Sequence, residues 1–220
     1  MALPSIAPYT LPESSDHAEN RVSWTLDPHR AVLLVHDLQE HFVDAFQSAG
    51  GDGPAEVAVG NVARLRDAAD VTGMPVVYTA QPPDQDPGER GLLTDFWGPG
   101  LRTAESARIV AEVAPRDHHV VLTKWRYNAF IRTPLLDLMR EWGRDQMVVV
   151  GVYAHIGCLL TAADAFMHDI QPFVVGDAVA DFSLEHHVQA LDYAAERCAT
   201  VTRTDAVLRT LATGALGASR

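Results

Sequence analysis

The sequence predicts an α/β fold of the doubly wound kind, in which helices cover both faces of a six-stranded parallel sheet. Four unbroken apolar runs indicate buried strands, at residues 31–35, 75–78, 120–122 and 147–150. Runs rich in β-branched residues, separated by segments of helical length, are typical of parallel sheets that are buried on both faces. Two later runs, at residues 173–176 and 199–203, complete the six strands.

The segments between these strands carry helical patterns. A glycine-rich turn precedes Pro54, which is a favourable residue for the first position of a helix. Apolar residues that would pack on the sheet then recur at helical spacing, at Ala58, Val62, Leu65 and Ala69. Further helices are predicted at residues 103–113, 134–142, 157–168 and 184–197.

The length and composition predict one domain, at residues 31–220. At 220 residues and 47% hydrophobic composition, the chain can bury a full core. Residues 1–30 are rich in proline and polar residues and lack clear periodicity, so we expect an N-terminal arm laid over the domain. The connection from residue 81 to residue 117 is long for a compact domain, which indicates that it helps to build a site.

Charge and cysteine content exclude several classes of protein. Asp and Glu number 29 against 17 Lys and Arg, so the acidic surface would repel nucleic acid and anionic membranes. The sequence shows neither an apolar run of about 20 residues nor a basic-then-apolar signal peptide. Its two cysteines, Cys158 and Cys198, have no metal-ligand spacing. We therefore expect a cytoplasmic protein in a reducing setting.

A polar residue follows each of the first four predicted strands. These residues are Asp37, Gln81, Lys124 and Tyr153. The carboxyl ends of parallel strands meet at one edge of an open sheet, where ligands bind at the point at which the strand order reverses. We therefore expect a pocket between the strand before Asp37 and the strand that ends at Tyr153, which makes the protein an enzyme candidate.

Each of these residues also has a purely structural explanation. A lone aspartate at the position of Asp37 is equally well explained as a helix N-cap or turn residue. Lys124 at a converging strand end favours a buried ion pair instead, because a buried charge needs a partner. Arg90, in the long connection, is either a surface charge or a site residue. Aromatic residues near the strand ends belong either to the core or to a wall on which a substrate stacks, namely Phe42, Phe96, Trp97 and Tyr127.

The histidines do not predict a metal site. None shows an HExxH spacing or a tight cluster with aspartate, and most are expected to be solvated. In the neighbouring pair His118 and His119, the two side chains are expected to point to different sides. The histidines considered are His36, His41, His118, His119, His155, His168, His186 and His187.

The chain resembles the isochorismatase-like hydrolases over nearly its whole length. The matching segments are residues 35–42 (VHDLQEHF), 78–82 (YTAQP), 95–100 (DFWGPG), 123–127 (TKWRY), 151–157 (GVYAHIG) and 177–183 (DAVADFS). The resemblance is to the subgroup of the isochorismatases and of the phenazine-pathway hydrolase that acts on 2-amino-2-deoxyisochorismate. It implies a Rossmann-type fold and a cis peptide bond between Val152 and Tyr153.

The resemblance also implies an activity and a set of site residues. The expected reaction is the hydrolysis of a vinyl ether, which releases pyruvate from a dicarboxylate without a cofactor or a metal ion. Asp37 would be the general acid and Lys124 its partner. The expected substrate-binding residues are Gln81, Arg90, Tyr153, Gly157, Phe42, Trp97 and Tyr127. We further expect a homodimer.

One position departs from the amidohydrolase members of this superfamily. A nucleophilic cysteine completes an Asp-Lys-Cys triad in those enzymes, whereas Gly157 stands there in this chain. Cys158 is one residue late, which on a helix is a rotation of about 100°, so it is expected to point away from the pocket and to pack. A cysteine amidohydrolase that uses Cys158 is one alternative, and an α/β module that binds without catalysis is another.

The substrate is expected to be 2-amino-2-deoxyisochorismate, which would give trans-2,3-dihydro-3-hydroxyanthranilate. The residues from Leu211 onward are too few for the carrier domain of some siderophore isochorismatases, so we expect a stand-alone enzyme. Residues 90–93 and 169–173 also look more like the phenazine branch. Isochorismate, which would give 2,3-dihydro-2,3-dihydroxybenzoate, is the alternative substrate.

Overall fold

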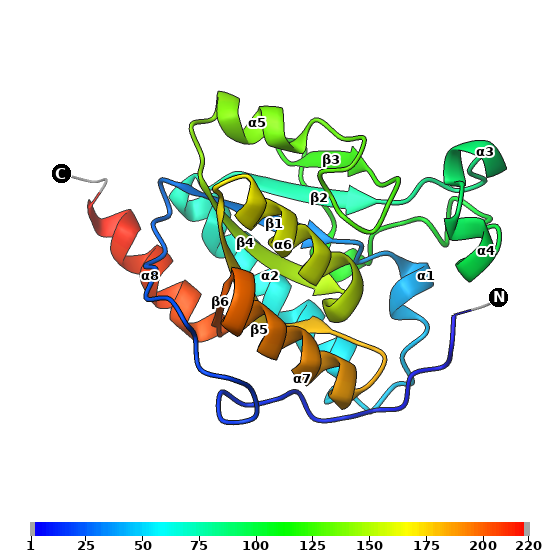
Figure 1. The fold of residues 1–220 in the computed structure, drawn as a ribbon, viewed down its shortest axis with the longest axis horizontal. Helices are drawn as coiled ribbons and strands as arrows, with labels where there is room; N and C mark the ends of the chain where they lie inside the picture. The colour runs from blue at the N-terminus through cyan, green and yellow to red at the C-terminus, as the bar shows by residue number, and fades with distance from the viewer. Residues whose placement is uncertain (1–2, 218–220) are drawn as a thin grey trace.

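The computed structural model describes residues 3–217, so the last three residues of the predicted domain lie outside the described residues. Six parallel strands form one sheet in the order β3-β2-β1-β4-β5-β6, which confirms the doubly wound fold (Figure 1). The strands are β1 (Ala31–His36), β2 (Val76–Ala80), β3 (Val120–Thr123), β4 (Gln146–Val152), β5 (Gln171–Ala180) and β6 (Thr200–Thr202).

Helices cover both faces of the sheet. Since successive side chains of a strand point to opposite faces, each strand contributes to two hydrophobic cores. In β1, Leu33 and Val35 pack in a core with residues of α2 and α8. Val32 and Leu34 pack in a second core with residues of α5, α6 and α7. The covering helices are α2 (Pro54–Thr72), α5 (Leu135–Glu141), α6 (Leu159–Met167), α7 (Leu184–Tyr193) and α8 (Thr204–Gly217).

Helix α2 begins where its sequence predicts. Pro54 is its first residue, and the Glu56 carboxylate accepts the backbone N–H of Gly53 at 2.9 Å. Gly73, with φ +68°, ends the helix in the left-handed conformation that glycine adopts readily. The predicted apolar stripe is buried against the sheet, at Ala58, Val62, Leu65 and Ala69.

The strand order reverses between β1 and β4, which is where ligands bind in doubly wound sheets. From β1 the chain builds β2 and β3 on one side, and β4, β5 and β6 lie on the other. The loops and short helices α1 (Glu40–Val43), α3 (Pro87–Arg90) and α4 (Leu93–Trp97) gather at the end to which the strands point (Figure 1). At the end of β4, the Val152–Tyr153 peptide bond is cis, as predicted.

The long connection between β2 and β3 differs from its predicted structure. The predicted helix at residues 103–113 is wrong, because this segment forms turns followed by one 3₁₀ turn, Ala111–Val113. Thr103 and Ser106 bond to each other's backbone, which competes with helix formation. Ile109 forms an isolated bridge with Gln39. The sequence patterns also missed the short helices α1, α3 and α4 and the C-terminal helix α8.

The N-terminal segment runs along the domain beside α7 (Figure 1). Ile6 forms a parallel bridge with Phe46, and the backbone N–H of Asp181 donates to Tyr9 Oη at 2.8 Å. Asn20 exchanges two hydrogen bonds with the backbone of Val201. Within the described residues, no helix has the length and apolar character needed to cross a bilayer.

Gly151 in β4 provides a test of how closely the strands approach at the switch point. Its φ is +112°, and an added Cβ would stand 2.1 Å from the carbonyl oxygen of His36. Gly151→Ala should therefore lower the free energy of unfolding by about 2–5 kcal/mol, through backbone strain and overpacking. Gly60→Ala in α2 is the matched control, because an added Cβ there meets nothing within 4 Å.

The control substitution should stabilise the protein by about 0.5–1 kcal/mol, because alanine favours a helix interior over glycine. Urea unfolding of both variants measures the difference. Equal stability of Gly151→Ala and the parent would contradict the close approach of β1 and β4.

Candidate active site

A cavity of about 370 Å³ opens at the carboxyl ends of β1 and β4. The structure brings all nine sequence-predicted site residues to its lining, namely Asp37, Phe42, Gln81, Arg90, Trp97, Lys124, Tyr127, Tyr153 and Gly157. It adds residues that the sequence analysis did not select, among them His36, His41 and Phe182. The N-terminal arm contributes Leu3 to the same lining.

Asp37 follows β1 directly, and each oxygen of its carboxylate accepts a hydrogen bond from another strand end. Its φ is +48°, in the left-handed region that residues other than glycine seldom adopt. Oδ1 accepts from Thr79 Oγ1 at 2.5 Å, and Oδ2 accepts from Lys124 Nζ at 2.8 Å. The N-cap of α1 is Gln39, so the helix-capping explanation of Asp37 is wrong.

Lys124 follows the edge strand β3 and is fully buried, with 1% of its side chain exposed. Its Nζ donates to Asp37 Oδ2 and to His36 Nε2, each at 2.8 Å. A buried ammonium group is tolerated only when it is paired and hydrogen-bonded, and this one is both. The predicted ion pair between Asp37 and Lys124 therefore forms across three neighbouring strands.

The charges of this pair determine the state of Asp37. Burial raises the pKa of Asp37, but attraction by Lys124 and the hydrogen bonds from Lys124 and Thr79 outweigh it, so the pKa is lowered. Burial lowers the pKa of Lys124, and the charge of Asp37 opposes this shift. Because the pair is joined by a charge-assisted hydrogen bond, we assign carboxylate and ammonium forms in the ligand-free protein.

His36 is buried, so it is not one of the solvated histidines. Its Nδ1 lies 2.8 Å from the carbonyl oxygen of Val152, to which it donates. Burial, together with Lys124, lowers the pKa of His36 to about 4, so the ring is neutral at pH 7 and its Nε2 accepts from Lys124. His119 and His187 are buried as well. The position of His36 at the end of an entirely apolar run was the signal that sequence analysis could have used.

Arg90 lines the same cavity as the ion pair and is buried, with 4% exposure, so the surface-charge explanation is wrong. Its Nε donates to the carbonyl oxygen of Gly98 at 2.7 Å. Its Nη1 donates to the side-chain oxygens of Gln81, at 3.2 Å, and Gln85, at 2.9 Å. Among residues 3–217 no carboxylate forms an ion pair with Arg90. The cavity therefore contains a buried cation whose protein partners are all uncharged.

Aromatic side chains form much of the remaining wall. Tyr153 Oη donates to the carbonyl oxygen of Phe42 at 2.9 Å, and burial raises the pKa of this phenol. Trp97 Nε1 donates to Tyr127 Oη at 2.5 Å. The ring of Phe182, which sequence analysis missed, lies 4.4 Å from that of Tyr153 between centroids. These bonds use the polar atoms of the aromatic residues and leave apolar faces for a ligand.

Gly157 and Cys158 have different surroundings. Gly157 lines the cavity, and a Cβ added to it would stand 2.0 Å from Cε1 of His36. Cys158 is fully buried and packs with Val149 and Ala162 in the core beneath α6. Burial raises the pKa of the Cys158 thiol well above its usual value. Cys158 is therefore a packing residue, as predicted, and an inert thiol at neutral pH.

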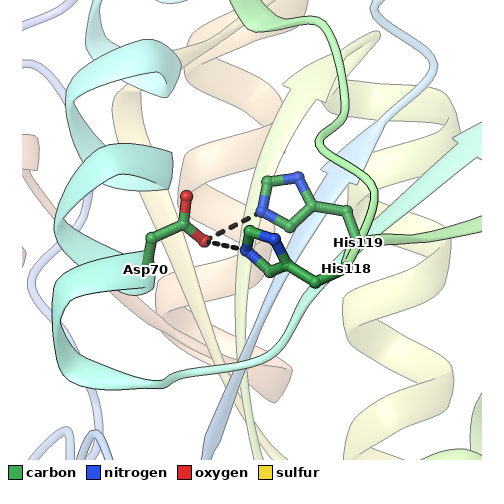
Figure 2. Close-up of side chains that lie close together, drawn as sticks. All are labelled: Asp70, His118 and His119. Atoms are coloured by element: carbon green, nitrogen blue, oxygen red, sulfur yellow. Dashed lines mark hydrogen bonds and ion pairs between the residues drawn. The ribbon is translucent and has the colours of Figure 1, made fainter.

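A second polar cluster lies at the opposite end of the sheet, where His118 and His119 both approach Asp70 of α2 (Figure 2). The expectation that these histidines point to different sides is wrong, because Nε2 of each lies 2.9 Å from Asp70 Oδ1. The backbone N–H of Arg116 donates to His119 Nδ1, so the proton of the neutral ring is on Nε2 and faces Asp70. The Arg116 guanidinium pairs with the other carboxylate oxygen. This network uses the groups that would otherwise be metal ligands.

The doubly wound sheet, with an Asp–Lys pair at the carboxyl ends of its strands and a glycine in the third place, defines an isochorismatase-like hydrolase. The isochorismatase domain matches residues 31–206, and the chain belongs to the isochorismatase family. The match begins at β1 and includes the segments that carry Asp37, Lys124 and Gly157.

Individual relatives agree with this assignment. The chain is 56% identical over 209 residues to an isochorismatase of Bacillus subtilis (strain 168), covering 94% of this chain and 66% of that protein. It is 50% identical over 207 residues to phenazine biosynthesis protein PhzD of Pseudomonas fluorescens, covering 94% of this chain and 98% of that protein. A cysteine hydrolase from Pseudomonas syringae pv. phaseolicola 1448A has a TM-score of 0.79 at 22% identity, over 88% of this chain and 97% of that chain, and it shows the fold alone.

The buried histidines predict how stability depends on pH. Burial is the main cause that lowers the pKa of His36 and of His187 from 6.5 to about 4. Between these values the unfolded chain binds protons that the folded protein does not, so stability should fall as the pH falls from 6.5 toward 4. Each histidine contributes up to about 1.4 kcal/mol per pH unit.

Urea unfolding between pH 7.5 and 4.5 measures this slope. The range lies above the titration of Asp70, whose pKa is lowered to about 2 against the effect of burial, chiefly by bonds from His119 and His118. His187→Gln should remove about half of the slope that the two histidines produce. A stability that stays constant over this range would contradict the neutral, buried state of both rings.

Proposed function

We propose that this protein hydrolyses the vinyl ether of an enolpyruvyl-substituted cyclohexadiene carboxylate and releases pyruvate. The observation that carries the proposal is the combination of charges in one cavity. Asp37 and Lys124 compensate each other, whereas Arg90 has only uncharged partners within the described part of the chain. With His36 neutral, the cavity carries a net positive charge, which favours an anionic substrate.

The guanidinium of Arg90 is arranged to bind a carboxylate. Its Nε and Nη1 atoms donate hydrogen bonds within the protein, whereas Nη2 has no protein partner among the described residues. A guanidinium group has five N–H donors in a fixed plane, and carboxylates accept from it with charge assistance. Gly100 leaves room for the group, because an added Cβ would stand 2.5 Å from Nη1. The aromatic wall then supports the ring of the substrate.

In the proposed mechanism, Asp37 donates a proton to the terminal methylene carbon of the enolpyruvyl group. The carbon–carbon double bond supplies the electron pair, and an oxocarbenium ion forms at the adjacent carbon. Water adds to this carbon and loses a proton to the Asp37 carboxylate. The hydroxyl group of the resulting hemiketal loses its proton as the carbonyl group of pyruvate forms. The bond to the ring oxygen breaks with its electron pair, the ring oxygen takes up a proton in place of the one released, and pyruvate leaves. Asp37 ends each cycle as it began.

The Asp37 proton must arrive with the substrate. In the ligand-free protein the lowered pKa keeps Asp37 ionised, although burial opposes this state. A dianionic substrate raises the pKa of a neighbouring carboxyl group by repulsion, and it also removes water from the cavity. Lys124 then balances the charge that returns to Asp37 after proton transfer.

The absence of a side chain at Gly157 supports a mechanism without a covalent intermediate. The cysteine amidohydrolase alternative needs a reactive thiol, and Cys158 is a buried packing residue with a raised pKa. The alternative of a non-catalytic binding module does not account for a buried ion pair that lines a cavity beside an uncompensated cation.

We further propose 2-amino-2-deoxyisochorismate as the substrate and trans-2,3-dihydro-3-hydroxyanthranilate as the second product. Support comes from the PhzD relative of Pseudomonas fluorescens, 98% of whose length the chain covers. Isochorismate is the second candidate, because identity is higher, at 56%, to the Bacillus subtilis isochorismatase. We also propose that the protein is a homodimer and that it acts in the cytoplasm. Comparing kcat/KM for the two compounds tests the choice, and a clear preference for isochorismate would overturn it.

Asp37→Asn tests the general acid. The amide keeps the shape and polarity of the side chain but has no acidic proton, so kcat for pyruvate release should fall by roughly 10²–10⁴-fold. Binding should persist, because Arg90 and Lys124 keep their positive charges. Pyruvate release is followed by a coupled lactate dehydrogenase assay, and affinity by calorimetry with a saturated substrate analogue.

Cys158→Ser is the matched control for the alternative mechanism. Its kcat should stay within about threefold of the parent, provided that the variant is folded, because the thiol only packs. A Cys158→Ser protein that is folded but inactive would favour the cysteine amidohydrolase instead. An Asp37→Asn protein that released pyruvate at the parent rate would show that another group is the acid.

A further inference from the structure

His36 occupies the space that a side chain at position 157 would need. A Cβ built on Gly157 would stand 2.0 Å from Cε1, 2.6 Å from Nε2 and 2.8 Å from Nδ1 of the imidazole. Contacts under 3.0 Å with the rigid ring of a fully buried residue cannot be relieved by a small rotation. The imidazole and the glycine are therefore a matched pair, and a side chain at position 157 requires a smaller residue at position 36.

The imidazole is fixed at both nitrogens. Nδ1 donates to the carbonyl oxygen of Val152 at 2.8 Å, which leaves the lone pair of the neutral ring on Nε2. This lone pair faces Lys124 Nζ at 2.8 Å, and the carbonyl oxygen of Tyr127 lies 3.1 Å from the same nitrogen. His36 thus presents an acceptor, and not a second cation, to the buried ammonium group.

This acceptor determines where the ammonium group points. An ammonium group has three N–H donors. One donates to Asp37 and one to His36, which leaves the third for a ligand, because the described residues offer it no further recorded partner. Lys124 lines the cavity, so this donor is available to a substrate. Without His36, the ammonium group would lose one of the two hydrogen-bond acceptors that fix its orientation.

We propose that His36 is a positioning residue that holds Lys124 against Asp37 and fills the place that a nucleophilic side chain at position 157 would occupy. The first part rests on the proposed function, and the second part rests on geometry alone. The presence of the imidazole thereby excludes covalent catalysis from position 157 and directs the Asp–Lys pair to acid catalysis.

The steric part is tested by a double-mutant cycle between His36→Ala and Gly157→Ala. Gly157→Ala alone should lower the Tm by about 5 °C or more, because its Cβ meets the ring. In the His36→Ala background the same substitution should lower the Tm by less than half as much. Equal effects in both backgrounds would overturn the proposal that the imidazole fills this space.

A thiol at position 157 provides a second measurement of the same space. In the His36→Ala/Gly157→Cys protein, iodoacetamide should alkylate residue 157 at least tenfold faster than it alkylates the parent, whose Cys158 and Cys198 are buried. Peptide mass spectrometry identifies the modified residue. Alkylation no faster than in the parent would show that the vacated space does not open to the cavity and would count against the proposal.

The positioning part is tested by His36→Phe and His36→Gln. Phenylalanine fills the space but accepts no hydrogen bond, so kcat should fall at least tenfold while KM changes less than twofold. Glutamine offers an oxygen acceptor and should restore kcat to within about fivefold of the parent. If His36 positions Lys124, kcat should depend on whether the variant offers Lys124 a hydrogen-bond acceptor. If its role is purely structural, kcat should instead vary with the Tm of the variants.

The pH profile separates this role further. The groups that face His36 are Lys124, Asp37 and the carbonyl oxygens of Val152 and Tyr127. Protonation of His36 would place a second cation against Lys124, so the acid limb of kcat should change shape in His36→Gln. Identical pH profiles, or equal kcat in the Phe and Gln variants, would overturn the positioning role. A parent that releases no pyruvate refutes the proposed function and leaves the double-mutant cycle unaffected.

Discussion

The buried ion pair between Asp37 and Lys124 is the interaction on which the rest of the site depends. Removing two charges from water costs several kcal/mol per ion, and mutual attraction offsets this only with good geometry and further hydrogen bonds. Thr79 supplies one such bond to Asp37, and His36 supplies one to Lys124. The absence of a side chain at Gly151 leaves room for the backbone of His36, and its absence at Gly157 leaves room for the imidazole ring. The pair is therefore supported by four strands that are distant in sequence.

The same pair explains how a doubly wound sheet can support acid catalysis. An isolated Asp37 would be neutral when buried, and an isolated Lys124 would lose its proton, so neither charge would exist without the other. Together they are neutral overall and leave Arg90 as the net charge of the cavity. A dianionic ligand shifts this balance toward a protonated Asp37. Substrate binding and acid activation are thus one electrostatic event.

Local sequence pattern was sufficient for the elements that depend on local forces. The six strands and the long helix α2 follow from apolar periodicity, and the position of the cavity follows from the topology of parallel sheets. The predicted helix at residues 103–113 failed because Thr103 and Ser106 bond locally to the backbone. Phe182 and the Asp70 cluster could not be predicted, because their environments are formed by segments that only the folded chain brings together. For His36 there was a signal, its position at the end of an apolar strand, but its partners also come from distant segments.

The central claim is that Asp37 is ionised in the free protein and takes up a proton when a dianionic ligand binds. Calorimetric titration of a saturated substrate analogue, in buffers of different ionisation enthalpy at pH 7.5, measures this proton directly. The account predicts an uptake of about one proton by the parent and almost none by Asp37→Asn. Tight binding to the parent without any proton uptake would contradict it.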